Sequence, residues 1–221
     1  MPALLLIHMI INHTHQKYIA QYNKLGKGRY NGAYYYSKEI CENIIPRVQT
    51  DRNWVTIKVP DTACDHSIVF IHNNLHMEYY DYLKRYKDLI LVCGINETAE
   101  KLTHLGKTIV LPLSIDLDYV KQFERPKTKY LAYVGRKEKL RFGKIASDAD
   151  IIHGLPRHLL LPKMAEYKYV YAVGRTAIEA KALGCSILPY DTRFPDTEAW
   201  KIFDNRGAAN ILQTKLDEIE G

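Results

Sequence analysis

A turn formed by Gly174 and Arg175 is the part of the sequence best suited to chemistry. It follows Tyr169–Val173, which has the β-branched and aromatic residues of a strand, and it precedes Thr176–Leu183, an expected helix that Gly184 ends. A strand that enters a helix through a tight glycine turn often binds an anion, because the first N–H groups of a helix have no partner within it. The spacing therefore predicts an anion site at this turn.

Backbone and side-chain donors at the turn suit a phosphate. Gly174 has no side chain and lets a ligand approach the main chain. The Arg175 guanidinium can bind a phosphate through two parallel hydrogen bonds. We expect the N–H groups of Ala177 and Ile178 to open toward the same anion, at the positive end of the helix.

Glu179, one turn into this helix, has two competing interpretations. Thr176 and Glu179 have the S/T-x-x-E spacing of a capping box, which satisfies the N–H groups of the helix itself and needs no ligand. Alternatively, the carboxylate contacts a ligand that is bound at the turn. A carboxylate has two oxygens and could serve both purposes, so the sequence leaves both roles open.

A second basic segment follows Tyr130–Val134, another expected strand. Gly135 comes directly after it, and the segment's candidate anion-binding side chains are Arg136, Lys139, Arg141 and Lys144. Such a loop can meet an anion. The alternative is a solvated basic loop with no ligand.

Histidines in the first half of the chain are candidates for proton transfer. His72 directly follows the apolar run Ser67–Ile71, and its side chain has an ordinary pKa near neutrality, about 6.5. His13 and His15 compete with it for this role, and a polar loop residue without catalytic function is the alternative for each. The glycine-rich loop Gly26–Gly32 contains Lys27 and Arg29, which could meet a phosphate.

Apolar runs of strand type alternate with helical runs almost throughout the chain. Leu4–Ile11, Ser67–Ile71 and Leu89–Cys93 are examples in the first half. This alternation favours parallel sheets covered by helices. The polar segment 121–129, which contains a proline, is predicted to be a linker. We therefore expect an α/β protein of two Rossmann-like domains, 1–120 and 130–221, with a central cleft and a closing helix at 208–220.

Two segments of the second half resemble the nucleotide-sugar-binding region of GT-B-type glycosyltransferases. Glu179–Gly184 has the family's E-A-x-A-x-G pattern after a glycine-containing turn, and Val134–Arg136 has the V-G-R that ends the first strand of its second domain. The segment from Leu111 to Asp116 is similar to the family's connection between domains. The resemblance runs in order through most of the chain.

The resemblance implies a role for each of these residues. In the family, the glutamate binds the ribose hydroxyls of the donor, and the turn before it lies near the diphosphate. Glu179 would then hold the ribose, while Gly174, Arg175 and Thr176 would contact phosphate. The basic loop would neutralise the leaving diphosphate, and the residues implied there are Gly135, Arg136 and Arg141, the last standing where lysine is usual.

In the first domain, the resemblance implies the acceptor side of the reaction. His72 stands where family members often have a histidine that faces the donor sugar, and it would be the catalytic residue. The loop containing Arg29 and Gly32 is similar to the glycine-rich loop that approaches donor and acceptor. No D-x-D motif has a suitable strand context. We therefore expect a metal-independent glycosyltransferase that needs no cofactor beyond its nucleoside-diphosphate sugar.

One departure from the family keeps other functions open. Many retaining members carry an earlier glutamate eight positions before the ribose glutamate, and that position is Tyr171 here. A non-catalytic protein that binds a nucleotide or nucleotide sugar is therefore one alternative, and a DNA-base glycosyltransferase is another. The acceptor could be a glycan, a small molecule or DNA. A dehydrogenase is disfavoured, because no G-x-G-x-x-G follows a strand.

Composition supports an anionic partner and an expected cytoplasmic location. The 221 residues include 31 Lys and Arg against 25 Asp and Glu, a formal charge of +6. The four cysteines are far apart and lack a C-x-x-C spacing, which favours a reducing compartment over a disulfide framework. The apolar run Leu4–Ile11 is too short to span a bilayer, which takes about 20 residues, so no transmembrane segment is expected.

Overall fold

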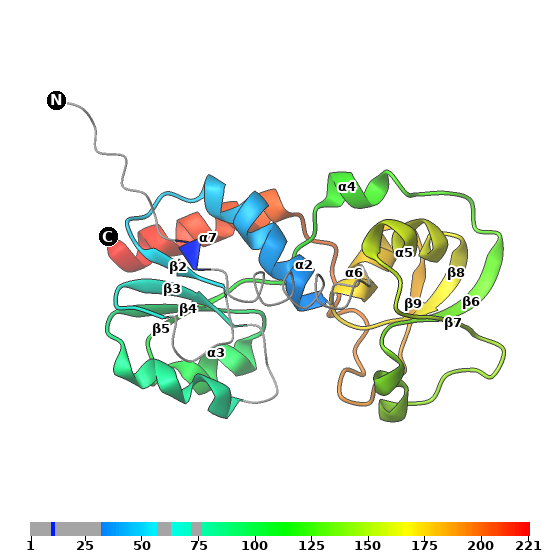
Figure 1. Cartoon of the computed structure of the whole chain (residues 1–221), viewed down its shortest axis with the longest axis horizontal. Coiled ribbons are helices and arrows are strands. Elements are labelled where there is room, and N and C mark those ends of the chain that lie inside the picture. The colour runs from blue at the N-terminus through cyan, green and yellow to red at the C-terminus, as the bar shows by residue number, and fades with distance from the viewer. Residues whose placement is uncertain (1–9, 12–31, 57–62, 72–76) are drawn as a thin grey trace, which may run out of the picture. The chain divides into compact units, whose positions relative to one another are not determined.

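Two compact α/β units make up the computed structural model (Figure 1), which describes residues 10–11, 32–56, 63–71 and 77–221. The first unit contains the described residues up to Pro112 together with Arg206–Gly221, and the second contains Leu113–Asn205. Each unit is built on its own parallel sheet. The expected α/β class with two parallel sheets is therefore confirmed.

A five-stranded parallel sheet with the strand order β1-β2-β3-β4-β5 forms the first unit. Its side chains are apolar on both faces, as in parallel sheets covered on both sides, and Ile68, Val69, Phe70, Ile90 and Leu91 are completely buried. The strands are β1 (Ile10–Ile11), β2 (Asn53–Val55), β3 (Ser67–Phe70), β4 (Leu89–Cys93) and β5 (Lys107–Val110).

Helices cover this sheet on both faces. Figure 1 shows α2 and α7 over one face and α3 over the other. Pro46 is the second residue of a tighter helical turn, Ile45–Arg47, because proline fits the first positions of a helix. The helical elements are α2 (Gly32–Glu39), η1 (Ile40–Ile44), η2 (Ile45–Arg47), η3 (Met77–Arg85), α3 (Asn96–Leu102) and α7 (Asn205–Glu220).

The C-terminal helix α7 lies with the first unit, which corrects its assignment to the domain 130–221. The amide of Gln49 donates to Oε1 of Gln213 at 2.6 Å, and Nζ of Lys107 donates to the carbonyl of Ile219 at 3.2 Å. Leu212 and Leu216 are fully buried. The apolar stripe of a helix shows that it must pack, but it does not show against which sheet.

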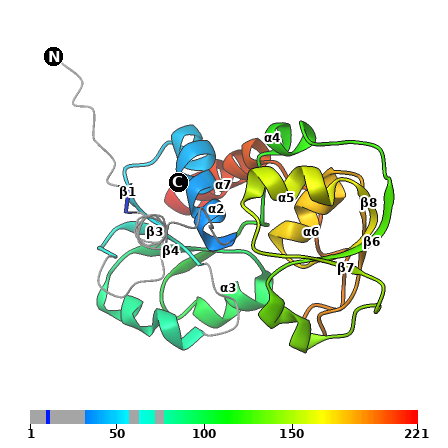
Figure 2. The same cartoon turned by 45° about the vertical axis from the view of Figure 1, so that its right-hand side comes forward.

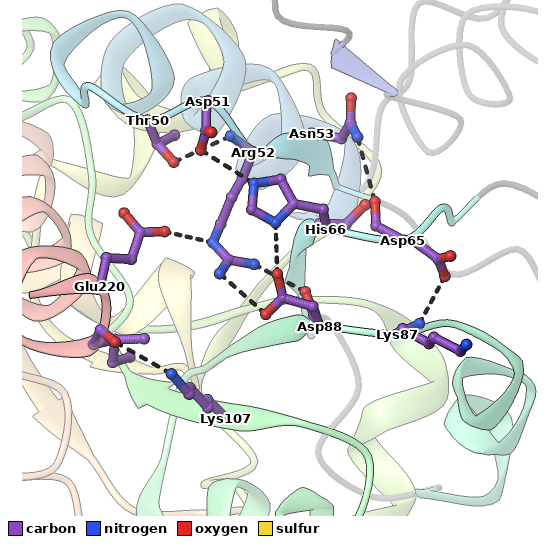
Figure 3. A network of polar contacts seen from close by, with 12 residues as sticks. Thr50, Asp51, Arg52, Asn53, Asp65, His66, Lys87, Asp88, Lys107 and Glu220 are labelled. Carbon is purple, nitrogen blue, oxygen red and sulfur yellow. Dashed lines mark hydrogen bonds and ion pairs between the residues drawn. The ribbon is translucent and has the colours of Figure 1, made fainter.

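An ionic network secures the end of α7 at the amino ends of β2, β3 and β4 (Figure 3). The guanidinium of Arg52 is bonded to the carboxylate of Glu220, to the carbonyl of Asp88 at 2.9 Å and to Oδ1 of Asp88 at 3.1 Å. His66 bridges Oδ2 of Asp88 at 2.6 Å and Oδ1 of Asp51 at 3.1 Å. These contacts lie at the amino ends of the strands, whereas parallel sheets bind ligands at the carboxyl ends. We therefore interpret the network as structural.

The second unit is a four-stranded parallel sheet with the order β7-β6-β8-β9. The chain leaves β6 toward one side for β7, then crosses to the other side for β8 and β9. The strands are β6 (Lys129–Val134), β7 (Asp150–Ile152), β8 (Tyr167–Tyr171) and β9 (Ser186–Leu188). The helical elements are α4 (Leu117–Lys121), η4 (Lys137–Phe142), α5 (Arg157–Met164) and α6 (Arg175–Ala182). Figure 2 shows α5 and α6 together over one face of this sheet.

The segment expected to be a linker, 121–129, belongs to the second unit. Nζ of Lys127 donates to the carbonyl of Ala165 at 2.7 Å and to that of Leu183 at 2.5 Å. Both acceptors lie just beyond the C-terminal ends of α5 and α6, where carbonyls have no partner within the helix and a cation is favourable. The charge of Lys127 in this polar segment therefore serves to cap two helices.

None of the helices in the described part of the chain is both long and apolar enough to cross a membrane.

Candidate functional site

The two predicted anion-binding turns lie next to each other at the carboxyl ends of the strands of the second sheet, here called its carboxyl edge. Gly135 and Arg136 follow β6, and Gly174 and Arg175 follow β8, its neighbour in the sheet. The strand order reverses between these two strands, since β7 lies on the far side of β6. Open α/β sheets bind ligands at such a reversal, beyond the carboxyl ends of the strands.

Gly174 is required at its turn by backbone conformation. Its φ is +62° and its ψ is −139°, a region that residues with a side chain avoid. A Cβ built on it would meet no atom within 4 Å. The space beside the turn is therefore open, as the predicted approach of a ligand to the backbone requires.

The expected role of the Ala177 and Ile178 amides is wrong. Both N–H groups donate to the carbonyl of Gly174, at 3.0 Å and 3.2 Å. The helix begins one residue earlier than the sequence suggested, with Arg175 as its first residue. The amides at the start of α6 are those of Arg175 and Thr176, which have no acceptor within the helix.

The capping-box interpretation of Thr176 and Glu179 is also contradicted. The residue that caps α6 is Gly174, and no side chain caps its N-terminus. Thr176 is the second helical residue, so it cannot act as the N-cap of a capping box. The Glu179 carboxylate instead contacts two arginines.

Glu179 lies at the centre of a buried ionic cluster. Its Oε1 accepts from Nε of Arg175 at 2.9 Å and lies 3.0 Å from Nε of Arg157. Glu179 is 4% exposed and Arg157 is 8% exposed. The Arg157 guanidinium also lies 4.9 Å from the centre of the Tyr119 ring. The buried carboxylate thus links the first residue of α5, Arg157, to the first residue of α6, Arg175.

Both arginines stand at the unfavourable end of a helix. Arg157 is the first residue of α5 and Arg175 is the first residue of α6. The N-terminus of a helix carries partial positive charge, so a cation there needs a nearby anion. Glu179 supplies one negative charge to two cations and two helix ends. The buried carboxylate therefore offsets the two cations at these helix ends.

Sequence reasoning missed Arg157 as a member of this cluster. The available signal was an arginine directly after Pro156, at an expected helix start where a cation is disfavoured. Its partner Glu179 comes from the next helix, and this pairing of distant segments leaves no local pattern.

The loop after β6 is shaped by a buried tyrosine. The hydroxyl of Tyr133 donates to the carbonyl of Arg136 at 2.7 Å, and a Cβ on Gly135 would lie 2.7 Å from that hydroxyl. Gly135 is therefore explained by packing. The side chain of Arg136 is exposed at the carboxyl edge.

Arg141 does not belong to the Glu179 cluster in the structure. It lines an open pocket together with Tyr190, Asp191 and Thr192, beyond the end of β9. Gly32 is the first residue of α2, in the first unit. His72 and Arg29 lie outside the residues that the structure describes, so their roles stay predictions.

The described residues also bear on metal and thiol chemistry. In the part of the chain that the structure describes, no group of three or more His, Cys, Asp or Glu side chains could hold a metal ion. The four cysteines are all free thiols. Burial raises the pKa of Cys93 to about 12, and burial also raises the pKa of Cys185. These two thiols are thus poor nucleophiles.

Comparison with known proteins found no matching protein-family model, curated protein or solved structure. The candidate site consists of two turns after adjacent strands, an open backbone at Gly174, and a buried carboxylate that contacts two arginines.

Proposed function

We propose that the chain is a glycosyltransferase that transfers sugar from a nucleoside-diphosphate sugar, with the donor bound at the carboxyl edge of the second unit. The observation that carries the proposal is the Arg157–Glu179–Arg175 cluster beside the strand reversal between β6 and β8. The reversal supplies the usual place for a nucleotide, and the cluster places two arginines at the first residues of α5 and α6. The proposed type of ligand, a nucleoside-diphosphate sugar, comes from the resemblance to GT-B-type enzymes.

The diphosphate is the part of the donor that the turn at α6 suits best. The amides of Arg175 and Thr176 begin the helix, and Gly174 leaves the space beside them open. Arg136 comes from the neighbouring strand and is exposed. Fixed amides and a guanidinium would stabilise the charge that develops as the diphosphate leaves.

Glu179 has two functions in this proposal. It holds the Arg175 side chain against the helix through the 2.9 Å bond, which fixes the guanidinium before ligand arrives. The resemblance adds contact with the ribose hydroxyls. The acid–base role of His72 and the acceptor side in the first domain are part of the same proposal, as is transfer without a metal.

Calorimetric titration with UDP, GDP and ADP tests the donor site. We expect one of the three nucleotides to bind saturably, and Arg136→Gln to weaken it by about tenfold, the usual effect of losing one charge-assisted hydrogen bond. Lys137→Gln removes the same charge from the next residue and serves as the control. The proposal fails if none of the three binds, or if both variants bind as wild type does.

A non-catalytic nucleotide-binding protein is the second candidate, and Tyr171 favours it. The residue at this position packs edge-on against Tyr190, with ring centres 6.4 Å apart, and supplies no carboxylate. Incubation with radiolabelled sugar nucleotides separates the two functions. Release or transfer of labelled sugar supports the transferase, whereas tight binding without turnover supports the binding protein.

A further inference from the structure

An open pocket of about 760 Å³ lies between η4 and the loop after β9. The amide of Thr192 donates to the carbonyl of Phe142 at 3.0 Å, and Gly143 pairs with Asp191 as an isolated bridge. A Cβ on Gly143 would lie 1.4 Å from the carbonyl oxygen of Tyr190, so only glycine allows this approach. The two loops that form the pocket are thus held together through their backbones.

Asp191, which lines the pocket, is paired with Arg193. Arg193 binds Asp191 with two hydrogen bonds, Nε to Oδ1 at 2.8 Å and Nη2 to Oδ2 at 2.6 Å. Asp191 is 1% exposed, and the hydrogen bond from Arg193 holds the pKa of that carboxyl below its usual range. The Arg193 guanidinium also lies 3.4 Å from the centre of the Phe142 ring. Asp191 and Phe142, which both line the pocket, are thus each in contact with the Arg193 guanidinium.

Three further cations surround the pocket. Arg141 and Lys144 line it, and Lys139 is half-buried beside the Asp191–Arg193 pair. Burial lowers the pKa of Lys139, and the like charges of Arg136 and Arg193 lower it further. Within residues 10–11, 32–56, 63–71 and 77–221, no ion pair is formed by Lys139, Arg141 or Lys144.

We propose that this pocket binds a dianionic phosphoryl group, the terminal phosphate of a phosphomonoester or of a diphosphate. Asp191 is already neutralised by Arg193, so the charge of the other three cations is left for a ligand. A tetrahedral dianion can share its oxygens among several cationic donors, which a neutral ligand cannot. An anion would also relieve the crowding of positive charge around Lys139.

The pocket is distinct from the Glu179 cluster, although the resemblance assigned one of its lining residues, Arg141, to the donor diphosphate. The residues that line the pocket and the three members of the Glu179 cluster have none in common. Either site can therefore fail its test while the other passes.

Calorimetric titration with inorganic phosphate and with pyrophosphate, at constant ionic strength, tests the pocket. The double variant Arg141→Gln/Lys144→Gln is expected to weaken the binding of at least one probe by about tenfold or more, from the loss of charge-assisted hydrogen bonds. Lys137→Gln removes a cation from the same helix, and Lys137 does not line the pocket. This control is expected to bind within about twofold of wild type, because Lys137 lies outside the pocket and can contribute only a screened, longer-range attraction.

The side-chain NMR signal of Lys139 provides a second readout. Bound phosphate is expected to raise the pKa of this lysine in wild type, since an anion favours the charged ammonium. Thermal unfolding of each variant checks that it is folded.

Three results would overturn the proposal. The first is the absence of saturable binding of either probe at millimolar concentrations. The second is an equal loss of affinity in Lys137→Gln and in the double variant, which would indicate diffuse attraction to a basic surface. The third is tighter binding of a single-stranded oligonucleotide than of either probe, which would indicate a surface for phosphodiester backbones.

Discussion

At the scale of single residues, Glu179 controls the candidate site because it is the shared counter-charge of two buried arginines. A buried ion pair adds little net stability when it forms, yet loss of one partner is costly because a charge is left without compensation. The cost therefore depends on which partner is removed. Removal of Glu179 leaves two guanidiniums without their common acceptor, whereas removal of Arg157 leaves the Arg175–Glu179 pair intact.

Glu179→Gln is predicted to lower the free energy of unfolding by about 3 kcal/mol, and Arg157→Met by no more than about 1 kcal/mol. Urea denaturation of the two variants and of wild type measures both values. Equal losses would show that the carboxylate does not balance the two arginines together.

Gly174→Ala is predicted to lower the free energy of unfolding by about 2 kcal/mol. The cause is the backbone conformation at φ +62°, since the added methyl group would meet no neighbour within 4 Å. Urea denaturation measures this loss. The dependence of the free energy of unfolding on urea concentration is expected to stay unchanged. Wild-type stability in the variant would mean that the turn does not have the conformation described.

Local sequence patterns identified part of the site. The glycine turn and the position of Glu179 follow from neighbouring residues, and the structure places Glu179 and Arg175 in contact. The helix start was misplaced by one residue, which made the amides of Ala177 and Ile178 seem available. Arg157 was missed because its partner lies on another helix, and contacts between distant segments have no local signature.

At the scale of elements, the strands were the most predictable features. Leu89–Cys93 was expected and observed with the same bounds, because a short run of apolar, β-branched residues suits only a buried strand. The strand expected at Tyr169–Val173 lies two residues earlier, at Tyr167–Tyr171. The residues after Tyr171 are equally apolar, so composition could not show that they form the turn.

The His66 network is predicted to make the stability of the first unit depend on pH. The hydrogen bonds that protonated His66 donates to Asp88 and then to Asp51 raise the pKa of His66 above its ordinary 6.5, and the bond from His66 lowers the pKa of Asp88 below its ordinary 3.8. Arg52 is the other charged group beside them, and its positive charge partly opposes the rise at His66. Urea denaturation over a range of pH measures the effect.

The sign of the effect differs for the two groups. A raised histidine pKa stabilises the fold below pH 6.5, and this contribution is lost as the pH rises through the raised value. A lowered carboxyl pKa stabilises the fold above pH 3.8 and is lost as the pH falls through the lowered value. The contribution of His66 and Asp88 to stability is thus greatest between pH 3.8 and pH 6.5. His66→Asn, which suits the φ of 55°, should abolish the decline on the alkaline side, and its persistence would contradict the assignment.

At the scale of the whole molecule, the sequence predicted two α/β units but divided the chain between them incorrectly. Segment 121–129 looked like a linker because it is polar, although Lys127 uses its charge to cap two helices. Helix α7 returns to the first unit after the second is complete. Such a return depends on which sheet offers a complementary surface, and amphipathicity alone cannot reveal it.

Leu216→Ala is predicted to weaken the first unit, with a loss of about 3 kcal/mol for a fully buried leucine. Hydrogen exchange followed by mass spectrometry should show faster exchange in peptides from β2 to β5. Peptides from β6, β8 and β9 are expected to change less. The reverse order would place α7 with the second unit.

The central claim is that a nucleoside diphosphate binds at the strand reversal of the second unit, and backbone NMR tests it most directly. Titration of the ¹⁵N-labelled chain with the best-binding nucleotide should shift the amide signals of Gly135, Arg136, Gly174, Arg175 and Thr176 in a saturable way. These residues frame the carboxyl ends of β6 and β8. Saturable shifts confined to other residues, or no shifts with any of UDP, GDP and ADP, would contradict the claim.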